Sequence, residues 1–508
     1  MPSPDPSHAP RCVVIGAGLS GLAAAELMAS EGWQTTIVDA AGRGGGVVET
    51  VRHDGWLVER SADNFLTTRP EALDTVQRLG LDAEILPVQA SARRALVLGR
   101  GRLHAVPAGF RLMVPGRLSS ILKSSLLTPA GKLRVMLERF VPTSTAADES
   151  LESFAVRRLG REAFERLVQP LVSGIWTADP ARLSMAAALP DFLAMEKRSG
   201  SLQAGEKTRL LTASGMEGTA GARYGNFATL TSGLDTLPTR WCQALRSSGV
   251  HQLHARVSAV QRTDRFRIVL EPAHGPAADT GFESPSASVL EADAVILTTP
   301  APRAAAMIRG ISQPLADELA GIDYAGSAVV CLGYPRAAVA HPLDAAGLVI
   351  PRQERRKILA VSFSSSKFPG RAPAGSVLMR VFLGGALDPE AATLDDATLI
   401  KRATNEVAEL LGATGSPTLT RIERWEAAMP QYHLGHLERM GRIKNLVETI
   451  RGCGLAGAGL EGVGIPQVIA SGQAAARQAM QTVNSDGAST AKESCEKESC
   501  ESTEKRKY

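Results

Sequence analysis

Two glycine-rich segments, near opposite ends of the chain, have residue types and spacing that suit the phosphates of a nucleotide. The first follows an apolar run at 12–15 and reads Gly16-Ala17-Gly18-Leu19-Ser20-Gly21, and the second spans 454–466. In a strand-turn-helix unit, the first glycine permits the tight turn, the second admits a pyrophosphate, and the third lets helix and strand pack closely. Free N–H groups at the helix N-terminus favour negative charge. The first segment therefore predicts a dinucleotide site, and its pairing with the second points to a bound flavin.

Asp39 supplies the next part of the pattern. It ends a strand-like run at 35–38, where an acid can accept hydrogen bonds from ribose hydroxyls. A GxGxxG pattern alone also fits a glycine-rich turn that binds nothing. The strand before it, the apolar helix after it and the acid at the end of the second strand are the context that the motif requires. We therefore favour the dinucleotide site.

The elements that must position these segments alternate along the chain. Apolar residues recur with helical spacing at 151–195 and 395–411. Strand-like runs occupy 253–260, 266–270, 294–297, 328–332, 358–363 and 377–383. Because the two glycine-rich segments must meet in one site, the nucleotide domain is expected to be discontinuous.

We therefore predict an α/β fold with a discontinuous Rossmann-type FAD-binding domain, a mixed-sheet substrate domain and a helical subdomain. The predicted parts are a flexible N-terminus at 1–10, an FAD-binding domain at 11–90, 226–300 and 450–483, a substrate-binding domain at 91–108 and 301–449, a helical subdomain at 109–225, and a disordered tail at 484–508. The tail is assigned as disordered because it contains almost no apolar residues. Its Cys495 and Cys500 could form a metal or redox pair, but a repeated tail sequence explains them more simply.

The composition bounds what the protein can be. The chain has 508 residues, a formal net charge of +4 and 44% hydrophobic residues, which suits a globular protein without the basic excess that binds nucleic acid. No run approaches the ~18 apolar residues of a membrane span, and residues 1–10 resemble neither a signal peptide nor a transit peptide. The six cysteines lack the spacing of a disulfide framework, which suits a reducing compartment. We expect a cytoplasmic protein.

A basic amphipathic region lies between 109 and 140, where Pro115 and Pro129 divide it into short helices. Its large apolar residues are interspersed with arginines and lysines. Helices of this kind lie on an anionic membrane surface or, more often, cover a protein core. Both alternatives stay open, and peripheral contact with the inner membrane face is compatible with a cytoplasmic location.

Further motifs give the chain a family resemblance. Arg43-Gly44-Gly45-Gly46 follows Asp39, and Gly-Val-Gly-Ile-Pro at 462–466 closes the second glycine-rich segment. In this order the motifs resemble the amine oxidase and porphyrinogen oxidase superfamily of FAD enzymes. The segments 103–107, 174–180 and 425–436 are similar to the porphyrinogen oxidase branch. The resemblance runs from about residue 11 to residue 483.

The resemblance implies a set of cofactor contacts. Gly16, Gly18 and Gly21 would hold the pyrophosphate, and Asp39 the ribose. The remaining contacts would come from Arg43, Gly45, Gly46, Ser61, Ala62, Asp63 and Asn64 along the flavin, Val257 near the adenine, and Val463, Gly464 and Ile465 at the isoalloxazine. The chain departs from the family pattern in having Asp39 for the usual Glu, Ser-Ala-Asp-Asn at 61–64 for a Gly-Pro-rich turn, and Leu460 for a frequent Tyr.

The resemblance also implies a substrate. Arg94 matches the position at which the family binds a substrate propionate, with Arg93 as its rival, and Gly174 falls in a substrate-binding segment. The implied activity is the FAD-dependent, oxygen-using oxidation of protoporphyrinogen IX or coproporphyrinogen III to the porphyrin in heme biosynthesis. A ferrochelatase-type partner is compatible with this activity. FAD carries the difficult chemistry, so no catalytic side chain is assigned.

Other interpretations remain. An amine oxidase or a carotenoid-type desaturase would have the same fold, although 4% aromatic residues disfavour the first and the arginines at 93–102 disfavour the second. A non-catalytic flavin- or porphyrin-binding protein also stays open. His433 and His436 have a spacing that permits metal binding, but no further ligands cluster with them and no metal is predicted. Cys453 is interpreted as a buried thiol rather than a covalent flavin link.

Overall fold

The computed structural model describes residues 9–212, 226–273 and 281–504. The chain forms two compact units. Unit 1 comprises Met1–Gly46, Leu237–Gly321 and Arg439–Tyr508, and unit 2 comprises Val47–Thr236 and Ile322–Glu438. Unit 1 thus gathers three separate segments of the chain, as a discontinuous nucleotide domain requires.

The division differs from the predicted boundaries in several places. Residues 47–90 and 226–236, which we assigned to the FAD-binding domain, fall in unit 2. The hairpin of β3 (Thr50–His53) and β4 (Trp56–Glu59) explains this, because Trp56 and Val58 pack in one core cluster with Val329 and Leu378 of unit 2. Conversely, 301–321 and 439–449, which we assigned to the substrate domain, belong to unit 1. Part of the predicted helical subdomain, 213–225, lies outside the described residues.

Unit 1 is built on a seven-stranded sheet of order β14-β13-β12-β2-β1-β15-β21. The strands β12, β2, β1, β15 and β21 pair in parallel, and β13 and β14 extend the sheet by antiparallel pairing. The strands are β1 (Arg11–Ile15), β2 (Gln34–Asp39), β12 (His251–Arg262), β13 (Phe266–Pro272), β14 (Val289–Ala292), β15 (Ala294–Leu297) and β21 (Cys453–Leu455). After Arg11, every residue of β1 is buried, which is typical of a parallel strand covered on both faces.

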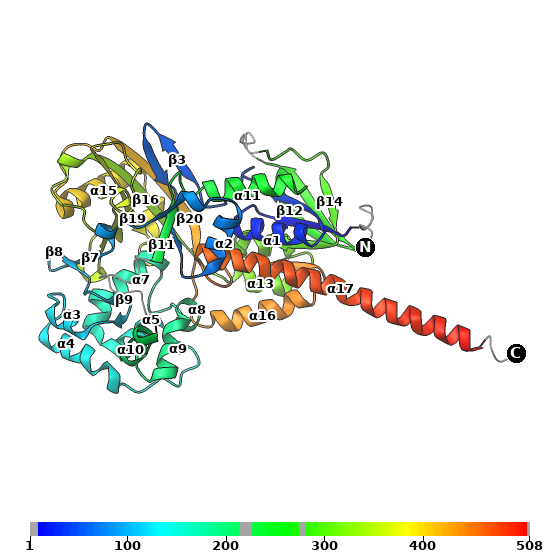
Figure 1. Cartoon of the computed structure of the whole chain (residues 1–508), viewed down its shortest axis with the longest axis horizontal. Helices are drawn as coiled ribbons and strands as arrows, with labels where there is room; N and C mark the ends of the chain where they lie inside the picture. Colours follow the sequence, from blue (N-terminus) through cyan, green and yellow to red (C-terminus); the bar gives the residue numbers. More distant parts are fainter. Residues whose placement is uncertain (1–8, 213–225, 274–280, 505–508) are drawn as a thin grey trace. The chain divides into compact units, whose positions relative to one another are not determined.

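The helices of unit 1 are α1 (Leu19–Ser30), α11 (Thr236–Ser247), α12 (Ala301–Ile308), α13 (Gln313–Ala320), α16 (His436–Glu448) and α17 (Ile465–Glu504). Both α11 and α16 begin in the last residues of unit 2. Helices α1 and α17 lie side by side (Figure 1) and are in contact. A Cβ added at Gly472 would overlap the backbone oxygen of Ser20, so only glycine permits this close approach.

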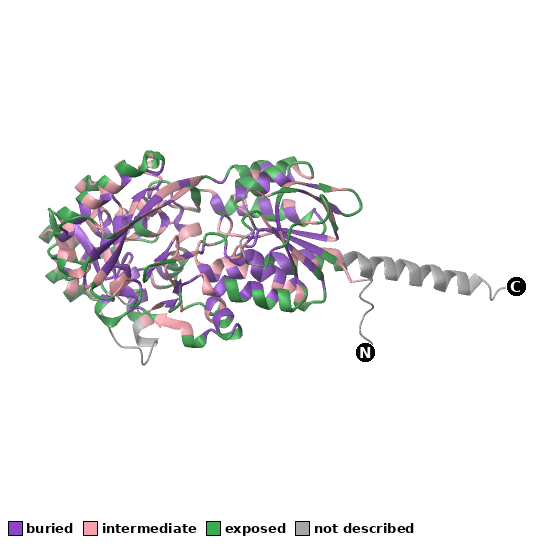
Figure 2. Cartoon of the chain, turned by 90° about the horizontal axis from the view of Figure 1, so that it is seen from above, coloured by how far each residue is buried: buried purple, intermediate pink, exposed green. Residues whose placement is uncertain are grey.

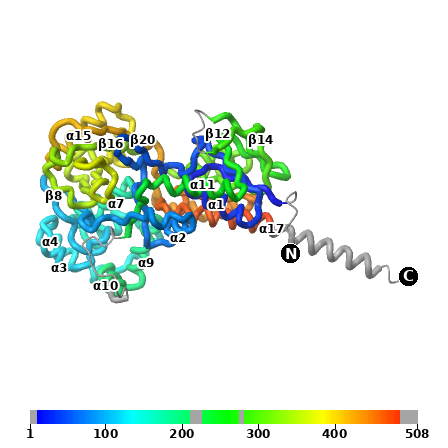
Figure 3. Tube along the Cα trace, turned by 45° about the horizontal axis from the view of Figure 1, so that its top comes forward, coloured from blue at the N-terminus to red at the C-terminus, as the bar shows by residue number. Residues whose placement is uncertain are grey.

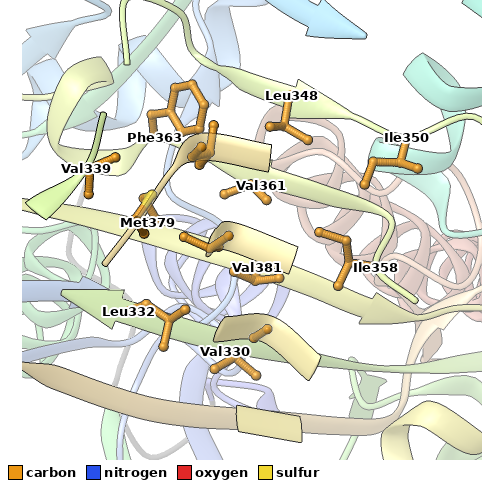
Figure 4. Packing of buried hydrophobic residues seen from close by; sticks show 14 of the residues in the cluster. Val330, Leu332, Val339, Leu348, Ile350, Ile358, Val361, Phe363, Met379 and Val381 are labelled. Carbon is orange, nitrogen blue, oxygen red and sulfur yellow. The ribbon is translucent and has the colours of Figure 1, made fainter. Parts of the chain in front are cut away.

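Unit 2 contains a second seven-stranded sheet, of order β20-β16-β19-β18-β17-β7-β8. Its neighbours are antiparallel except for β17 and β7, which makes it the mixed sheet that we predicted. The strands are β7 (Ala95–Gly99), β8 (Arg102–Ala105), β16 (Tyr324–Pro335), β17 (Gly347–Val349), β18 (Ala360–Ser362), β19 (Ser376–Gly384) and β20 (Leu419–Pro430). Aliphatic residues of β16, β17, β18 and β19 interlock on one face of this sheet (Figure 4).

Short strands and many helices complete unit 2. The remaining strands are β5 (Phe65–Leu66), β6 (Ile85–Pro87), β9 (Phe110–Arg111), β10 (Val114–Pro115) and β11 (Phe227–Leu230). The α-helices are α2 (Pro70–Arg78), α3 (Leu118–Lys123), α4 (Pro129–Met136), α5 (Leu151–Leu159), α6 (Arg161–Ala163), α7 (Gln169–Trp176), α8 (Met185–Ala188), α9 (Pro190–Ser199), α10 (Leu202–Thr212), α14 (Ser364–Lys367) and α15 (Asp396–Leu411). A π-helix occupies Phe164–Val168, and 3-10 turns occupy Asp82–Glu84, Ala90–Ala92, Leu137–Phe140, Arg336–Ala338, Arg352–Glu354 and Pro389–Thr393.

The basic region at 109–140 has the short helices that its prolines predict. Helices α3, α4, α9 and α10 gather in one part of unit 2 (Figure 3). Pro129 is the first residue of α4, and Thr128 Oγ1 caps that helix by accepting a 3.1 Å hydrogen bond from Gly131 N. Proline is well tolerated at this position because its missing N–H would have no partner in the helix.

The tail at 484–508, which we predicted to be disordered, follows directly from the folded part of unit 1. Helix α17 continues to Glu504, so residues 484–504 are helical, and 505–508 lie outside the described residues. The prediction used the shortage of apolar residues, which limits burial but does not prevent helix formation. The stretch contains no proline, and five of residues 484–504 are glutamate, which has a high helix propensity.

The pattern of burial follows the two sheets. Strands of both sheets are largely buried, whereas many of the outer helices carry one buried and one exposed face (Figure 2). Within the described ranges, no helix combines the length and apolar character that crossing a membrane demands.

Candidate cofactor site

The turn between β1 and α1 is shaped by its three glycines. Gly16 has a φ of +107°, and a Cβ placed there would lie 2.7 Å from Thr298 Oγ1. A Cβ at Gly21 would overlap Gly16 O, so helix and turn pack this closely only without a side chain. At Gly18 no atom lies within 4 Å of the place where a Cβ would stand. The turn is therefore closed by packing at its ends and open at Gly18, as contact with a pyrophosphate requires.

The start of α1 is left uncapped. Gly18 is the N-cap residue and no side chain accepts a hydrogen bond there. The first N–H groups of a helix have no partner inside the helix, and its dipole places partial positive charge at the same end. This end of α1 is therefore suited to an anion, and it lies beside the open face of Gly18.

Asp39 ties the end of β2 to the glycine turn. Its Oδ2 accepts a 2.8 Å hydrogen bond from Ala17 N, and its Oδ1 accepts a 2.7 Å hydrogen bond from Ala41 N. Burial raises the pKa of Asp39, and the two backbone donors and Arg43 only partly offset this effect. Each carboxylate oxygen keeps a second lone pair, so the side chain can still accept a hydrogen bond from a ribose hydroxyl.

The Arg43–Gly46 loop lies against the glycine turn. Gly45 N donates a 2.8 Å hydrogen bond to Ala17 O, and Gly18 and Gly45 form a parallel β-bridge. A Cβ at Gly46 would stand 3.2 Å from Gly18 Cα. Arg43 Nη2 donates to Gly46 O at 2.9 Å, so the guanidinium folds over its own loop. The structure thus brings Arg43, Gly45 and Gly46 to the pyrophosphate end of the predicted site.

The second glycine-rich segment follows β21, which pairs with β15 in the same sheet. Gly457 has a φ of +126° and donates a 3.1 Å hydrogen bond to Ser471 Oγ in α17. A Cβ at Gly457 would stand 3.9 Å from Ser20 Oγ, so this segment lies near the first turn of α1. Val463, Gly464 and Ile465 then lead into α17, whose first turn includes a 3.0 Å bond from Val468 N to Gly464 O.

Two polar groups near these segments were not predicted from the sequence. Thr298 Oγ1, at the end of β15, donates within 3.0 Å of both Ile15 O and Gly16 O and so braces the turn. Gln467 Oε1 is buried beside Gly464 and accepts no hydrogen bond from the described residues. Neither residue belongs to a spacing motif. Thr298 could have been found from its position directly after an apolar strand. Nothing in the residue spacing of the sequence indicates a role for Gln467.

The predicted contacts of unit 2 centre on Asp63. The segment 61–64 joins β4 to β5, and Asp63 forms an ion pair with Lys367 Nζ and lies 3.4 Å from Arg380 Nη1. Arg380 also donates to Ser61 O. Burial alone would raise the pKa of Asp63, but Lys367 and Arg380 outweigh it and hold the pKa below its usual range. Neither basic residue was predicted as a site residue.

Val257 lies on a different part of unit 1. His254 of β12 pairs with Asp39 at the end of β2, and β12 continues past that point through Val257. Ligands of parallel α/β sheets bind beyond the carboxyl ends of the strands. The half-buried Val257 is therefore on the expected side of the sheet, next to a β-bulge at Val257/Ala259.

The predicted substrate residues are separate from the Asp63 contacts. Arg94 is exposed and forms an ion pair with Asp344, and its Nε donates a 2.8 Å hydrogen bond to Asp344 O. Arg93 Nε donates to Val88 O at 3.2 Å. Gly174 is exposed on α7, where a Cβ would meet Val349 Cγ1 at 3.6 Å. Arg94 is thus held by an acid that a substrate carboxylate would have to replace.

His433 and His436 contact neighbouring side chains, and Cys453 is buried. His436 stacks on Tyr432 with ring centroids 4.0 Å apart, and His433 Nδ1 lies 3.2 Å from Asp323 Oδ2. Cys453 is fully buried, as predicted, and burial raises the pKa of its thiol to about 12. A thiol with so high a pKa is a poor nucleophile.

The residues of unit 1 fit a flavin adenine dinucleotide. The open face of Gly18, the uncapped start of α1 and Asp39 match its pyrophosphate and ribose. Gln467 Oε1 is an unused acceptor beside Gly464, where the isoalloxazine was predicted and a ring N–H could donate to it.

Known proteins share this sequence and fold. Residues 19–480 match the family described as flavin containing amine oxidoreductase. The chain is 32% identical over 445 residues to a coproporphyrinogen III oxidase of Bacillus subtilis (strain 168), covering 86% of this chain and 90% of the relative. It is 29% identical over 453 residues to the chloroplastic protoporphyrinogen oxidase of Nicotiana tabacum, covering 85% and 78%.

Solved structures share the fold of this chain. A crystal structure from Exiguobacterium sp. 255-15, provisionally named a protoporphyrinogen oxidase, has a TM-score of 0.77 at 27% identity and covers 92% of this chain and 98% of its own. A reduced UDP-galactopyranose mutase shares the fold at a TM-score of 0.68 and 16% identity, covering 94% and 98%. These matches confirm the predicted α/β fold and support FAD as the cofactor. The chain belongs to the flavin-containing amine oxidoreductase family.

Proposed function

We propose that the protein catalyses the FAD-dependent oxidation of a porphyrinogen, protoporphyrinogen IX or coproporphyrinogen III, to the porphyrin in heme biosynthesis. The observation that carries this proposal is the similarity to the Bacillus subtilis coproporphyrinogen III oxidase over nine tenths of that relative. A second relative of that name, from Propionibacterium freudenreichii subsp. freudenreichii, is also 32% identical. The glycine turn and Asp39 of unit 1 support the cofactor that the reaction needs. Molecular oxygen is the proposed electron acceptor.

FAD, when bound, would accept a hydride from the substrate. The N-terminal turn of α1 and Gly18 would hold its pyrophosphate, and Asp39 its ribose. Arg43, Gly45 and Gly46, the segment 61–64, Val257 and the segment 463–465 are the further proposed contacts. Rigid placement of the cofactor lets the protein accelerate the reaction by orientation alone, which is consistent with the lack of an assigned catalytic side chain.

Arg94 is proposed to bind a substrate propionate, near the segment that contains Gly174. A guanidinium can bind a carboxylate through two parallel hydrogen bonds. Arg94 already contacts Asp344, through one carboxylate oxygen and the backbone oxygen. Binding would therefore exchange one carboxylate for another without leaving the arginine unpaired. Because the Arg94–Asp344 pair is exposed to solvent, breaking it costs little free energy.

Porphyrin fluorescence tests the proposal directly. FAD-loaded protein is given protoporphyrinogen IX in one reaction and coproporphyrinogen III in another, in air and under argon, with the Gly18→Ala variant as the control. We expect fluorescence above the rate of autoxidation with one of the two substrates in air, and bleaching of the flavin under argon. Loss of yellow colour with an amine or a carotenoid, and with neither porphyrinogen, would contradict the proposal.

We also propose that the protein is cytoplasmic and that the α3–α4 region contacts the surface of a membrane. Five large apolar side chains are exposed in this region, namely Leu118, Leu122, Leu133, Leu137 and Phe140. Arg117, Lys123 and Arg139 are exposed among them, and the acid Glu138 is buried against Arg158. Apolar side chains with a basic surround suit an anionic lipid surface. A ferrochelatase-type partner that takes the porphyrin is compatible with this placement.

Vesicle flotation tests the membrane contact. We expect the protein to float with phosphatidylglycerol vesicles but not with phosphatidylcholine vesicles, and to lose binding in the Leu133→Glu/Phe140→Glu variant. Leu437→Glu is a matched control, because Leu437 is as exposed as these residues but lies outside the region. Equal binding by the control and the variant would overturn the proposed surface.

A further inference from the structure

A buried histidine lies next to Asp39 at the edge of the sheet in unit 1. His254 of β12 pairs in parallel register with Asp39, which is the last residue of β2. His254 is 7% exposed, so it is more than nine tenths buried. Ligands of parallel α/β sheets bind beyond the carboxyl ends of the strands. His254 therefore lies at the place where Asp39 is proposed to contact the ribose of the cofactor.

The ring of His254 packs against the turn that follows Asp39. Gly42 has a φ of +61°, and a Cβ placed there would lie 2.9 Å from both Cγ and Cδ2 of the imidazole. The turn can approach the ring this closely because Gly42 has no side chain. The same turn is tied to the carboxylate by the hydrogen bond from Ala41 N to Asp39 Oδ1. One short segment thus holds the imidazole and the carboxylate as neighbours.

The imidazole has hydrogen-bonding capacity that the fold does not use. Within residues 9–212, 226–273 and 281–504, neither ring nitrogen of His254 has a hydrogen-bond partner. The backbone N–H of His254 is occupied, because it donates to Glu283 O at 2.8 Å. A neutral imidazole carries one N–H donor and one acceptor nitrogen. Polar side chains buried to this extent are hydrogen-bonded in most folded proteins, so a ligand that supplied a partner would stabilise the ring.

The electrostatics of Asp39 also place the imidazole close to its carboxylate. Burial raises the pKa of Asp39, and two backbone N–H groups, Arg43 and His254 act in the opposite direction. Positive charge on the ring would therefore help to keep the carboxylate ionised. An ionised carboxylate accepts hydrogen bonds but cannot donate one.

A ribose hydroxyl group needs both an acceptor for its hydrogen and a donor for its oxygen. Asp39 can supply the acceptor only, whereas a ring N–H of His254 can supply the donor. We propose that His254 is a further cofactor-binding residue, which donates a hydrogen bond to a hydroxyl oxygen of the adenosine ribose of FAD beside Asp39. The inference rests on the proposed contact of Asp39 with the ribose. The residues that carry it all belong to unit 1.

Competition between two nucleotides tests the inference without any porphyrinogen. The full chain, freed of flavin, is titrated with FAD in the presence of ADP or of dideoxy-ADP, which lacks both ribose hydroxyls. The variants are His254→Phe, which keeps a ring but has no donor, His254→Gln, which keeps a donor, and His251→Phe. His251 is a matched control because it is a histidine of the same strand that is exposed.

We expect the wild type to bind ADP more tightly than dideoxy-ADP. His254→Phe should weaken the binding of ADP about two- to tenfold and leave that of dideoxy-ADP unchanged, because one hydrogen bond is lost. The dissociation constant of FAD should rise by the same factor. His254→Gln should recover part of the loss, and His251→Phe should behave as the wild type. If His254→Phe does not fold, His254→Leu removes the donor with a smaller side chain.

Two results would contradict the inference in different ways. Equal weakening of ADP and dideoxy-ADP in His254→Phe would show that the ring only packs against the turn, and it would overturn the inference. A wild type that binds the two nucleotides equally would overturn the contact of Asp39 with the ribose as well. Failure of the FAD-loaded protein to oxidise either porphyrinogen would instead overturn the proposed activity and leave the nucleotide result unaffected.

Discussion

The glycine turn of unit 1 and a group of buried charges in unit 2, Asp63 with Lys367 and Arg380, here called the Asp63 cluster, are built in opposite ways. The turn makes room by leaving side chains out, so that backbone N–H groups face an open surface at Gly18. The cluster brings side chains together and buries their charge, at a cost that the fold must offset. The first site should therefore tolerate changes of charge but not of volume, and the second should tolerate changes of volume but not of charge.

The largest expected effect is at the cluster. Asp63→Asn keeps the shape of the side chain but leaves Lys367 and Arg380 without their carboxylate. Breaking a buried ion pair from one side costs about 3–5 kcal/mol, and we expect the free energy of unfolding in urea to fall by this amount. The double variant Asp63→Asn/Lys367→Met should regain most of it. A loss as large in the double variant as in Asp63→Asn would show that shape, not charge, matters here.

The next effect is at the glycine turn. Gly21→Ala places a Cβ on Gly16 O, and overpacking of this kind costs about 1–3 kcal/mol. We expect a lower melting temperature in the absence of FAD. Gly441→Ala in α16 is the matched control, because no atom lies within 4 Å of its Cβ position. Equal melting temperatures for the two alanine variants would contradict the claim that the glycine turn does not tolerate added volume.

A change that leaves the fold intact separates packing from binding. Gly18→Ala meets no atom within 4 Å, so the protein without FAD should melt at the wild-type temperature. The added methyl group occupies the space of the pyrophosphate, and we expect the FAD dissociation constant to rise about tenfold or more, a change of about 1.4 kcal/mol. Fluorescence titration with FAD measures it. An unaltered FAD dissociation constant in Gly18→Ala would show that Gly18 does not contact the cofactor.

A smaller effect concerns the substrate. Asp344→Ala frees Arg94 from its ion pair, so the KM for the porphyrinogen should fall two- to threefold with kcat unchanged, because exposed pairs are worth about 0–1 kcal/mol. Arg94→Ala should raise the KM. Steady-state fluorescence assays on both variants give the answer. If Asp344→Ala raises the KM, the arginine needs its acid for positioning.

The smallest effect is the response of the cluster to pH. The folded-state pKa of Asp63 lies below its ordinary value of about 3.9. Its contribution to stability is therefore complete above pH ~4 and is lost as the pH falls toward the lower folded-state pKa. Urea unfolding of the wild type and of Asp63→Asn should show a stability difference that shrinks below pH ~4. A constant difference would assign the effect to something other than ionisation.

The same contrast explains how much of the molecule could be predicted. Gly16, Gly18 and Gly21 lie within one turn, and local spacing reports local geometry. The glycine turn, the parallel sheet and the place of Asp39 at the end of β2 could therefore be predicted. The partners of Asp63 could not, because Lys367 and Arg380 are more than 300 residues away and have no fixed spacing from it. Likewise, the ion pair of Arg94 with Asp344 and the packing of 50–59 in unit 2 depend on long-range contacts.

The order of strands in unit 1 has a consequence for synthesis. β1 lies between β2, which follows it at once, and β15, which the ribosome makes only after all of 47–236 has emerged. At about 5–20 residues per second, this segment takes roughly 10–40 s to translate. During that time β1 has one unpaired edge, of the kind that can pair with a neighbouring chain. The nascent protein is thus exposed to aggregation, and to chaperones, until β15 has been made.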